Sequence, residues 1–253
     1  MVLKRLTLFT LAFYWLSLSS YGVSSSENAT ERSRERSGAR TEKFIGEART
    51  ESGELFYTEN HTITYDGKKP IKIETIYKDK NNKEKGRLVS DLSFDPYCPP
   101  HQFQDISARR SSSVEYLVGK SQLRIRNDKP GQSTQERVLT IDELKVCAQG
   151  AFFFMQDNIS VFMNNETRSL RFVVPPKLTH YGFRIRKINE NAEKNEITLR
   201  IEIDNWLFRL FAPSIEADIN TENRRLMQYR GASNLMGPGD RPVNVVITYQ
   251  YED

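Results

Sequence analysis

The sequence contains few of the residues from which metal and redox sites are built. Its 253 residues include two cysteines and three histidines. His61, His101 and His180 stand far apart, and none is at a metal-ligand spacing such as His-x-x-x-His. The cysteines lack a Cys-x-x-Cys arrangement, which argues against a redox site or a structural zinc. We therefore predict no metal and no cofactor, and we interpret the histidines as surface or half-buried side chains.

Motifs for nucleophilic or acid–base catalysis are also lacking. Ser233 follows Gly231 as in the first half of a nucleophile elbow, but the glycine two residues after the serine is missing and no helix is expected there. Glu202 and Asp204 alternate with isoleucines, so we expect both carboxylates to face water rather than to meet as an acid–base pair. The sequence thus predicts no catalytic residue. A hydrolase, the least favoured hypothesis, would need carboxylates, Ser233 or His180 to converge in a cleft.

No stretch of the chain concentrates charge of one sign. Lys and Arg number 37 against 33 Asp and Glu, which gives a formal net charge of +4. Between residues 78 and 87 the two kinds of charge are interleaved. A nucleic-acid binder would gather basic residues on one element, with aromatic platforms beside them. The pattern predicts a mixed, solvated surface and no nucleic-acid partner.

Long apolar runs are missing except near the N-terminus. Lys4 and Arg5 precede an apolar run from Leu6 to Leu18, and small residues follow it. This order is typical of a secretory signal peptide, which we place at residues 1–25. An uncleaved anchor is the alternative, but a run of roughly 13 residues falls short of the ~20 needed to cross a bilayer. We predict an exported protein, periplasmic or secreted, without a transmembrane span after cleavage.

Residues 26–43 are rich in Ser, Arg and Glu and contain almost nothing apolar. Such a segment cannot bury enough surface to hold one conformation, so we predict a flexible spacer. A basic tether to an anionic membrane surface is the alternative. The remaining residues, 44–253, show no internal boundary and are predicted to form a single β-rich domain.

Export makes the two cysteines informative, because an oxidising compartment allows Cys98 and Cys147 to pair. Such a bridge would enclose nearly fifty residues, and the chain-entropy model assigns it roughly 4 kcal/mol. Two separately buried thiols are the alternative.

From Phe44 onward, apolar residues recur with period two, which is typical of strands with one buried face. Short turns join consecutive runs, so neighbouring strands should be antiparallel. We expect twelve to fourteen strands. The expected strands include Ile71–Tyr77, Leu88–Phe94, Gln102–Ser107, Val114–Val118, Gln122–Arg126, Arg137–Thr140, Leu170–Val174, Tyr181–Ile185, Ile197–Ile203, Ile215–Ile219, Leu226–Arg230 and Val243–Tyr251.

One segment, Gly150 to Asn165, predicts a helix instead. Apolar residues recur there at steps of three and four, and Phe152 and Phe153 fall outside that stripe. A helix that is apolar over so much of its circumference is enclosed on several sides. We therefore predict a mainly β fold: a curved antiparallel sheet, a half-barrel or incompletely closed barrel, with this helix on its concave face. A β-sandwich is the alternative.

The space between helix and sheet is the predicted site. The leading hypothesis is a non-enzymatic binder or carrier of a lipid-like ligand. The same residues could instead only fill the core, and a structural or adaptor protein of the cell envelope, acting through its surface, is the second hypothesis. The candidate lining residues are Phe152, Phe153, Phe154, Phe162, Trp206, Phe208 and Phe211.

Several short patterns resemble a family of secreted bacterial proteins of unknown function. They are Phe44-x-Gly46-x-Ala48, then Gly53, Leu55, Tyr57, Glu59 and His61, Tyr77-x-Asp79, Phe94-Asp95-Pro96, Val174-Pro175, the group Arg225, Leu226, Tyr229, Gly231, Ser233 and Asn234, and Val245, Ile247 and Tyr249. The resemblance implies an exported bacterial protein of the cell envelope and implies no reaction. The cysteine pair and the long spacer depart from the family pattern.

Overall fold

The computed structural model describes residues 40–117, 119, 121–205, 214–239 and 241–252. These residues belong to one unit, Ser37–Asp253. The predicted signal peptide and most of the predicted spacer lie outside the described residues. The first strand, β1 (Arg40–Thr50), begins within residues 26–43, so the last four residues of the predicted spacer are part of the sheet.

The described strands form one 15-stranded sheet in the order β8-β7-β6-β5-β4-β3-β2-β1-β15-β14-β13-β12-β11-β10-β9. The strands after β1 are β2 (Leu55–Asp66), β3 (Lys69–Lys78), β4 (Glu84–Asp91), β5 (His101–Asp105), β6 (Arg110–Tyr116), β7 (Gln122–Asp128), β8 (Gln135–Thr140), β9 (Lys145–Cys147), β10 (Arg168–Val174), β11 (Thr179–Asn191), β12 (Glu196–Ile203), β13 (Ile215–Asn220), β14 (Leu226–Ala232) and β15 (Asn244–Tyr251). The predicted fold class is confirmed, and because all these strands share one sheet, a sandwich is not formed.

Alternation along each strand gives the sheet one buried face and one more exposed face. In β2, Tyr57, Glu59, His61 and Ile63 are buried, while the residues between them are more exposed. Short turns such as Gly67-Lys68, where the glycine has φ 60°, join antiparallel neighbours. β1 pairs with β15, so the first and the last strand along the chain lie next to each other in the middle of the sheet.

The sheet curves without closing, because β8 and β9 are its two edges. β9 pairs with β10 in parallel, and the chain between them crosses over through the helices. A short 3₁₀ helix, η1 (Pro175–Lys177), follows β10 and lies against β6 and β7. The sequence pattern missed β1 and the three-residue β9, both too weakly alternating to stand out.

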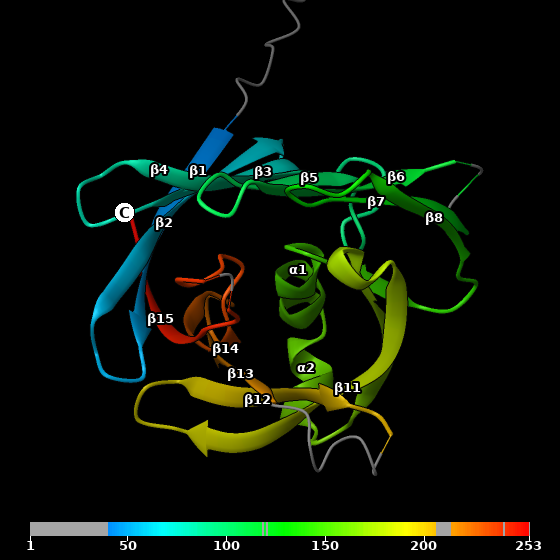
Figure 1. Cartoon of the computed structure of the whole chain (residues 1–253). Helices are drawn as coiled ribbons and strands as arrows, with labels where there is room; N and C mark the ends of the chain where they lie inside the picture. Colours follow the sequence, from blue (N-terminus) through cyan, green and yellow to red (C-terminus); the bar gives the residue numbers. More distant parts are fainter. Residues whose placement is uncertain (1–39, 118, 120, 206–213, 240, 253) are drawn as a thin grey trace, which may run out of the picture. The chain divides into compact units, whose positions relative to one another are not determined.

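The predicted helix is two helices, α1 (Gly150–Asp157) and α2 (Ile159–Met163). They are separated at Asn158, whose Nδ2 donates to the Phe154 carbonyl oxygen at 2.9 Å. The backbone N–H of Asn158 donates to the same oxygen at 3.2 Å. Asparagine side chains that bond to nearby backbone in this way are common where helices end. Figure 1 shows both helices enclosed by the curved sheet.

The helix α1 packs closely against the loop after β4. A Cβ added to Gly150 would lie 1.9 Å from the Tyr97 carbonyl oxygen, so only glycine fits there. The predicted disulfide between Cys98 and Cys147 is present and joins this loop to β9. Both sulfurs are buried in a small apolar cluster that spans the gap between the two edges of the sheet.

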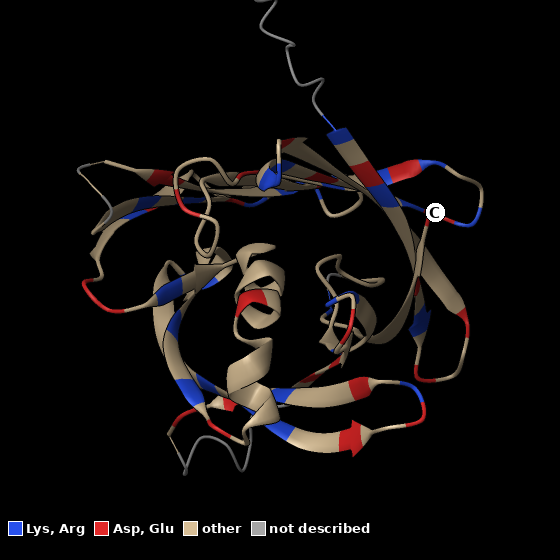
Figure 2. Cartoon of the chain, turned by 180° about the vertical axis from the view of Figure 1, so that it is seen from behind, with Lys and Arg blue, Asp and Glu red and all other residues tan. Residues whose placement is uncertain are grey.

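The helices carry almost no charged residues, whereas many Lys, Arg, Asp and Glu residues lie on the strands and their turns (Figure 2). Within α1 and α2, Asp157 is the single charged residue. Neither of these helices, nor any other in the described chain, has the length and apolar character needed to cross a bilayer.

Candidate functional site

A cavity of about 490 Å³ lies between α1 and the concave face of the sheet. This volume is within the roughly 300–1,000 Å³ of typical small-molecule sites. Two sides of it differ in chemistry. What we call the polar wall comprises Tyr57, Glu59, His61, Ile73, Thr75, Tyr77, Leu88, His101, Phe103 and Ser112 of β2–β6. What we call the apolar wall comprises Phe172, Val173, Val174, Phe183, Ile201, Ile215 and Ala217 of β10–β13.

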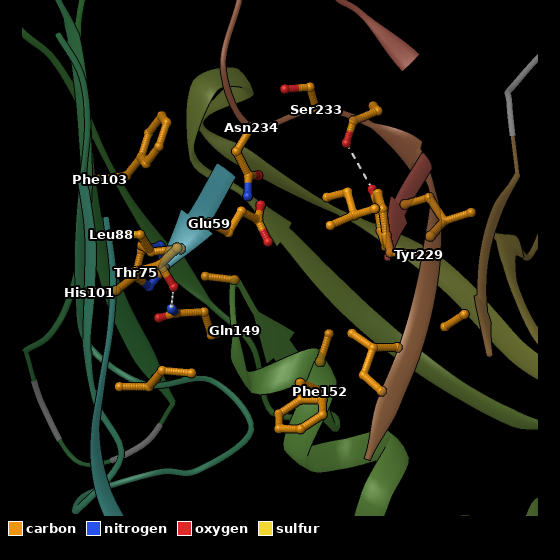
Figure 3. Close-up of a pocket in the computed structure, with 18 of the residues that line it drawn as sticks. Glu59, Thr75, Leu88, His101, Phe103, Gln149, Phe152, Tyr229, Ser233 and Asn234 are labelled. Carbon is orange, nitrogen blue, oxygen red and sulfur yellow. Dashed lines mark hydrogen bonds between the residues drawn. The ribbon is translucent and has the colours of Figure 1, made fainter. Parts of the chain in front are cut away.

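A carboxylate stands at the centre of the polar wall. The Glu59 side chain is 3% exposed. Its Oε2 accepts hydrogen bonds from His61 Nε2 at 3.0 Å and from the Tyr249 hydroxyl at 3.1 Å. Figure 3 shows Glu59 projecting from its strand into the cavity. The period of two places Glu59 and His61 on the same face of β2, so the strand itself brings the pair together.

The hydrogen bonds continue from His61 to the helix. Thr75 Oγ1 lies 2.7 Å from His61 Nδ1, and Gln149 Nε2 donates to Thr75 Oγ1 at 2.6 Å (Figure 3). Ser90 Oγ in turn donates to Gln149 Oε1 at 2.6 Å. Gln149 is the residue immediately before α1, so the network ties the helix start to strands β2, β3 and β4.

These bonds fit a line of donors that runs from Gln149 to Glu59. Thr75 Oγ1 accepts from Gln149, so its own proton is free to go to His61 Nδ1. In this arrangement His61 Nε2 is the nitrogen that donates to Glu59 Oε2. Every donor therefore points along one line that ends on the Glu59 carboxylate, which is what a buried negative charge requires.

Tyrosines surround the carboxylate. Burial, and next the negative charge of Glu59, raise the pKa of the Tyr57, Tyr77, Tyr229 and Tyr249 hydroxyls. These phenols therefore stay protonated at neutral pH. Tyr249 is the one of the four that donates to Glu59. The Tyr57 and Tyr77 hydroxyls accept from Ser233 and Asn234, and the Tyr229 hydroxyl donates to the Ala232 carbonyl oxygen.

The line from Thr75 through His61 to Glu59 contains the residue types of a nucleophilic triad. Two features argue against that chemistry. Thr75 is fully buried, and its oxygen is occupied by the Gln149 donor, which lowers its ability to attack a carbonyl. The arrangement instead holds Glu59 in place and suits binding.

The predicted ligand-binding residues separate into three groups. Phe152 lines the cavity. Phe153, Phe154 and Phe162 are buried in the main core, and the cavity lining does not include them. Trp206, Phe208 and Phe211 lie outside the described residues. The helix thus presents Ala151, Phe152 and Met155 to the cavity. Ala151 and Met155 belong to the stripe that the periodicity singled out, and Phe152 falls outside it.

Two histidine interpretations are wrong. His61 and His101 are buried, and His101 Nδ1 donates to the Pro99 carbonyl oxygen at 2.9 Å. Burial lowers the pKa of His101. His180 is half-buried as expected. The alternation of Tyr57, Glu59 and His61 with Ile63 was the signal that His61 faces inward.

Ser233 and Glu202, which the sequence offered as candidates for catalysis, lie in separate places in the fold. Ser233 lines the cavity, but its Oγ donates to the Tyr57 hydroxyl at 3.2 Å and accepts from the Leu235 N–H at 2.9 Å, and no histidine or carboxylate of the described residues hydrogen-bonds to it. Glu202 was expected to face water and is 6% exposed. Arg184 and Arg186 cover it, with Nη2 of Arg184 at 2.6 Å, which is why a carboxylate is buried there.

The geometry defines an open, curved antiparallel sheet around two helices, with a cavity that has one polar and one apolar side. No protein-family model matches the chain, and no curated protein matches its sequence. A solved structure with a similar chain course is a beta-barrel-like protein of a domain of unknown function, DUF1849, from Brucella abortus. The TM-score is 0.40 at 10% identity, over 84% of this chain and 98% of that one.

Proposed function

We propose that the protein is an exported, non-enzymatic binder or carrier of an amphipathic, lipid-like ligand held in the cavity between α1 and the sheet. The observation that carries the proposal is the contrast between the two walls. The apolar wall contains no side-chain nitrogen or oxygen, so it suits a hydrocarbon tail. The polar wall offers a carboxylate and protonated phenols, which suit a polar head.

Two features support export. The disulfide between Cys98 and Cys147 is of the kind that persists in oxidising compartments. The apolar run from Leu6 to Leu18, behind Lys4 and Arg5, has the form of a signal peptide. Sequencing the N-terminus of the protein recovered from an exporting host tests this, and an intact Met1 on the recovered protein would contradict cleavage.

Native mass spectrometry of the purified protein tests the binding proposal directly. We expect a co-purifying amphiphile, and rebinding of simple long-chain amphiphiles after it is removed. The variant Ala151→Phe places a ring in the cavity from the first turn of α1 and should lower binding at least tenfold. A gain of one aromatic side chain occupies much of the space that a tail would need.

The matched control is Ala192→Phe, at an exposed turn between β11 and β12. It adds the same ring away from the cavity and should leave binding unchanged. Circular dichroism and thermal unfolding of both variants check that the fold is retained. A protein that is always empty and binds no amphiphile would overturn the proposal and favour a protein that acts through its surface.

A further inference from the structure

The charge of the cavity is carried by one residue. Among the described residues that line it there is no Lys, Arg or Asp, and Glu59 is the single carboxylate. His61 is the hydrogen-bond partner of this carboxylate, with Nε2 3.0 Å from Glu59 Oε2. His101, the other histidine of the lining, donates to a carbonyl and lies in a buried setting that disfavours its charged form.

One oxygen of this carboxylate is available to a ligand. Both described hydrogen bonds of Glu59 end on Oε2. Oε1 accepts no hydrogen bond from the described chain and keeps some accessible surface where Glu59 lines the cavity. A donor on a ligand in the cavity could therefore reach Oε1 and form a hydrogen bond to a charged group.

Aromatic side chains surround the same position. The lining includes Phe44, Tyr57, Tyr77, Tyr229 and Tyr249. Ring faces attract cations, and their effect is largest where water is excluded. A carboxylate head, as in a fatty acid, would instead meet the negative charge of Glu59 in a poorly hydrated space, where repulsion between like charges is strong.

Building on the proposed function, we propose that the ligand carries a cationic amine head, which donates to Glu59 Oε1 while its tail lies along the apolar wall. The cavity therefore selects amines over alcohols, and alcohols over acids. The selection comes from the fixed carboxylate, since the tail side of the cavity treats the three classes alike.

Three probes with the same tail test this: decylamine, decanol and decanoate, each titrated into the wild-type protein by calorimetry below its aggregation limit. Decylamine should bind roughly tenfold to a hundredfold more tightly than decanol, the range expected for one hydrogen bond to a charged group. Decanoate should bind most weakly. Equal or tighter binding of decanoate would overturn the inference while leaving the proposed function intact.

The variant Glu59→Gln isolates the charge. The amide oxygen of glutamine can still accept from His61 and Tyr249, so the network and the fold should survive, which unfolding curves check. The ratio of decylamine to decanol affinity should fall to near one, and decanoate binding should improve. Glu51→Gln, the same change in an exposed turn, should leave the ratio as in the wild type.

The outcomes separate the two proposals. If none of the three probes binds the wild-type protein, the binding function itself fails and the amine preference fails with it. If the probes bind but Glu59→Gln keeps the wild-type ratio, the function stands and the role of Glu59 is wrong. Because the readout is a ratio within one protein, a partly unfolded variant does not mimic the expected result.

Discussion

Strands β2–β6 turn polar side chains toward the interior, whereas strands β10–β13 turn theirs outward. We call β1–β8 the first half of the sheet and β9–β15 the second half. Among the described residues, the buried polar side chains of the first half are Glu59, His61, Thr75, Ser90, His101, Asp105, Ser112 and Asn127. The second half has Glu202, which faces away from the cavity and lies between two arginines.

The outer face of the second half is held by cross-strand ion pairs. Arg200 and Glu216 lie opposite each other in neighbouring strands, with Nη2 and Oε1 2.7 Å apart. Arg230 continues the row to Glu216 and Asp218. Opposite charges on facing strand positions stabilise a sheet modestly, by roughly 0.2–1 kcal/mol per pair. The polar side chains of this half therefore stabilise the outer face of the sheet, and apolar side chains line its inner face.

The difference between the halves shows how one sheet can make a two-sided cavity. Both halves use the same alternation, so each strand has one face for the interior and one for the surface. Only the choice of residues on the inner face differs. A polar inner face is tolerable in the first half because hydrogen bonds link its buried polar side chains to one another.

Removing the disulfide should have the largest effect on the comparison, because it joins the two halves across the open edge. The Cys98 to Cys147 link has a sequence separation of 49, for which the chain-entropy model gives about 4 kcal/mol. Replacing both cysteines with alanine should lower the free energy of unfolding, measured in urea, by that amount. Wild-type protein with a reducing agent should lose a similar amount. Unfolding midpoints that do not change under reduction would show that the halves hold together without the bridge.

Placing a carboxylate on the apolar wall should have the next largest effect. Ile201→Glu puts at that wall the group that the polar wall accommodates, but without a donor network. We expect a loss of about 3 kcal/mol in the free energy of unfolding, since an unpaired buried charge is strongly unfavourable. The control is Val138→Glu at a 47% exposed site on edge strand β8, which should change stability little. Equal stability of the two variants would mean that the two walls do not differ as described.

Most of the fold could be predicted from the alternation of apolar and polar residues along the sequence. Runs such as Ile197–Ile203 fix a strand and its buried face together, and short turns leave antiparallel pairing as the one option. The apolar circumference of 150–165 also predicted an enclosed helix. The break at Asn158 was not predicted, because periodicity does not show which side chains bond to a local carbonyl.

The candidate site was predicted only in outline. The periodicity predicts that Phe152, Phe153 and Phe154 are all enclosed. Whether each side of the helix meets packed side chains or a cavity depends on the side-chain volumes of many strands together, which the periodicity does not give. Glu59 and His61 were visible as inward-facing positions of β2. Their role could not be inferred without Thr75 and Gln149. The pairing of β2 with β3 places Thr75 beside His61, and the start of α1 places Gln149 beside Thr75.

The polar wall should also make the protein sensitive to acid through His101. Burial lowers the pKa of this histidine below its usual value of 6.5, so the unfolded chain takes up a proton first as the pH falls. The stability that neutral His101 contributes is present above the unfolded pKa and is lost below it. One proton can change the free energy of unfolding by at most about 1.4 kcal/mol per pH unit. Urea unfolding of His101→Gln between pH 7 and pH 5 should show a shallower decline than the wild type. His180→Gln, on β11 and half-buried, should alter the decline less, and equal slopes for His101→Gln and wild type would exclude His101 as the source.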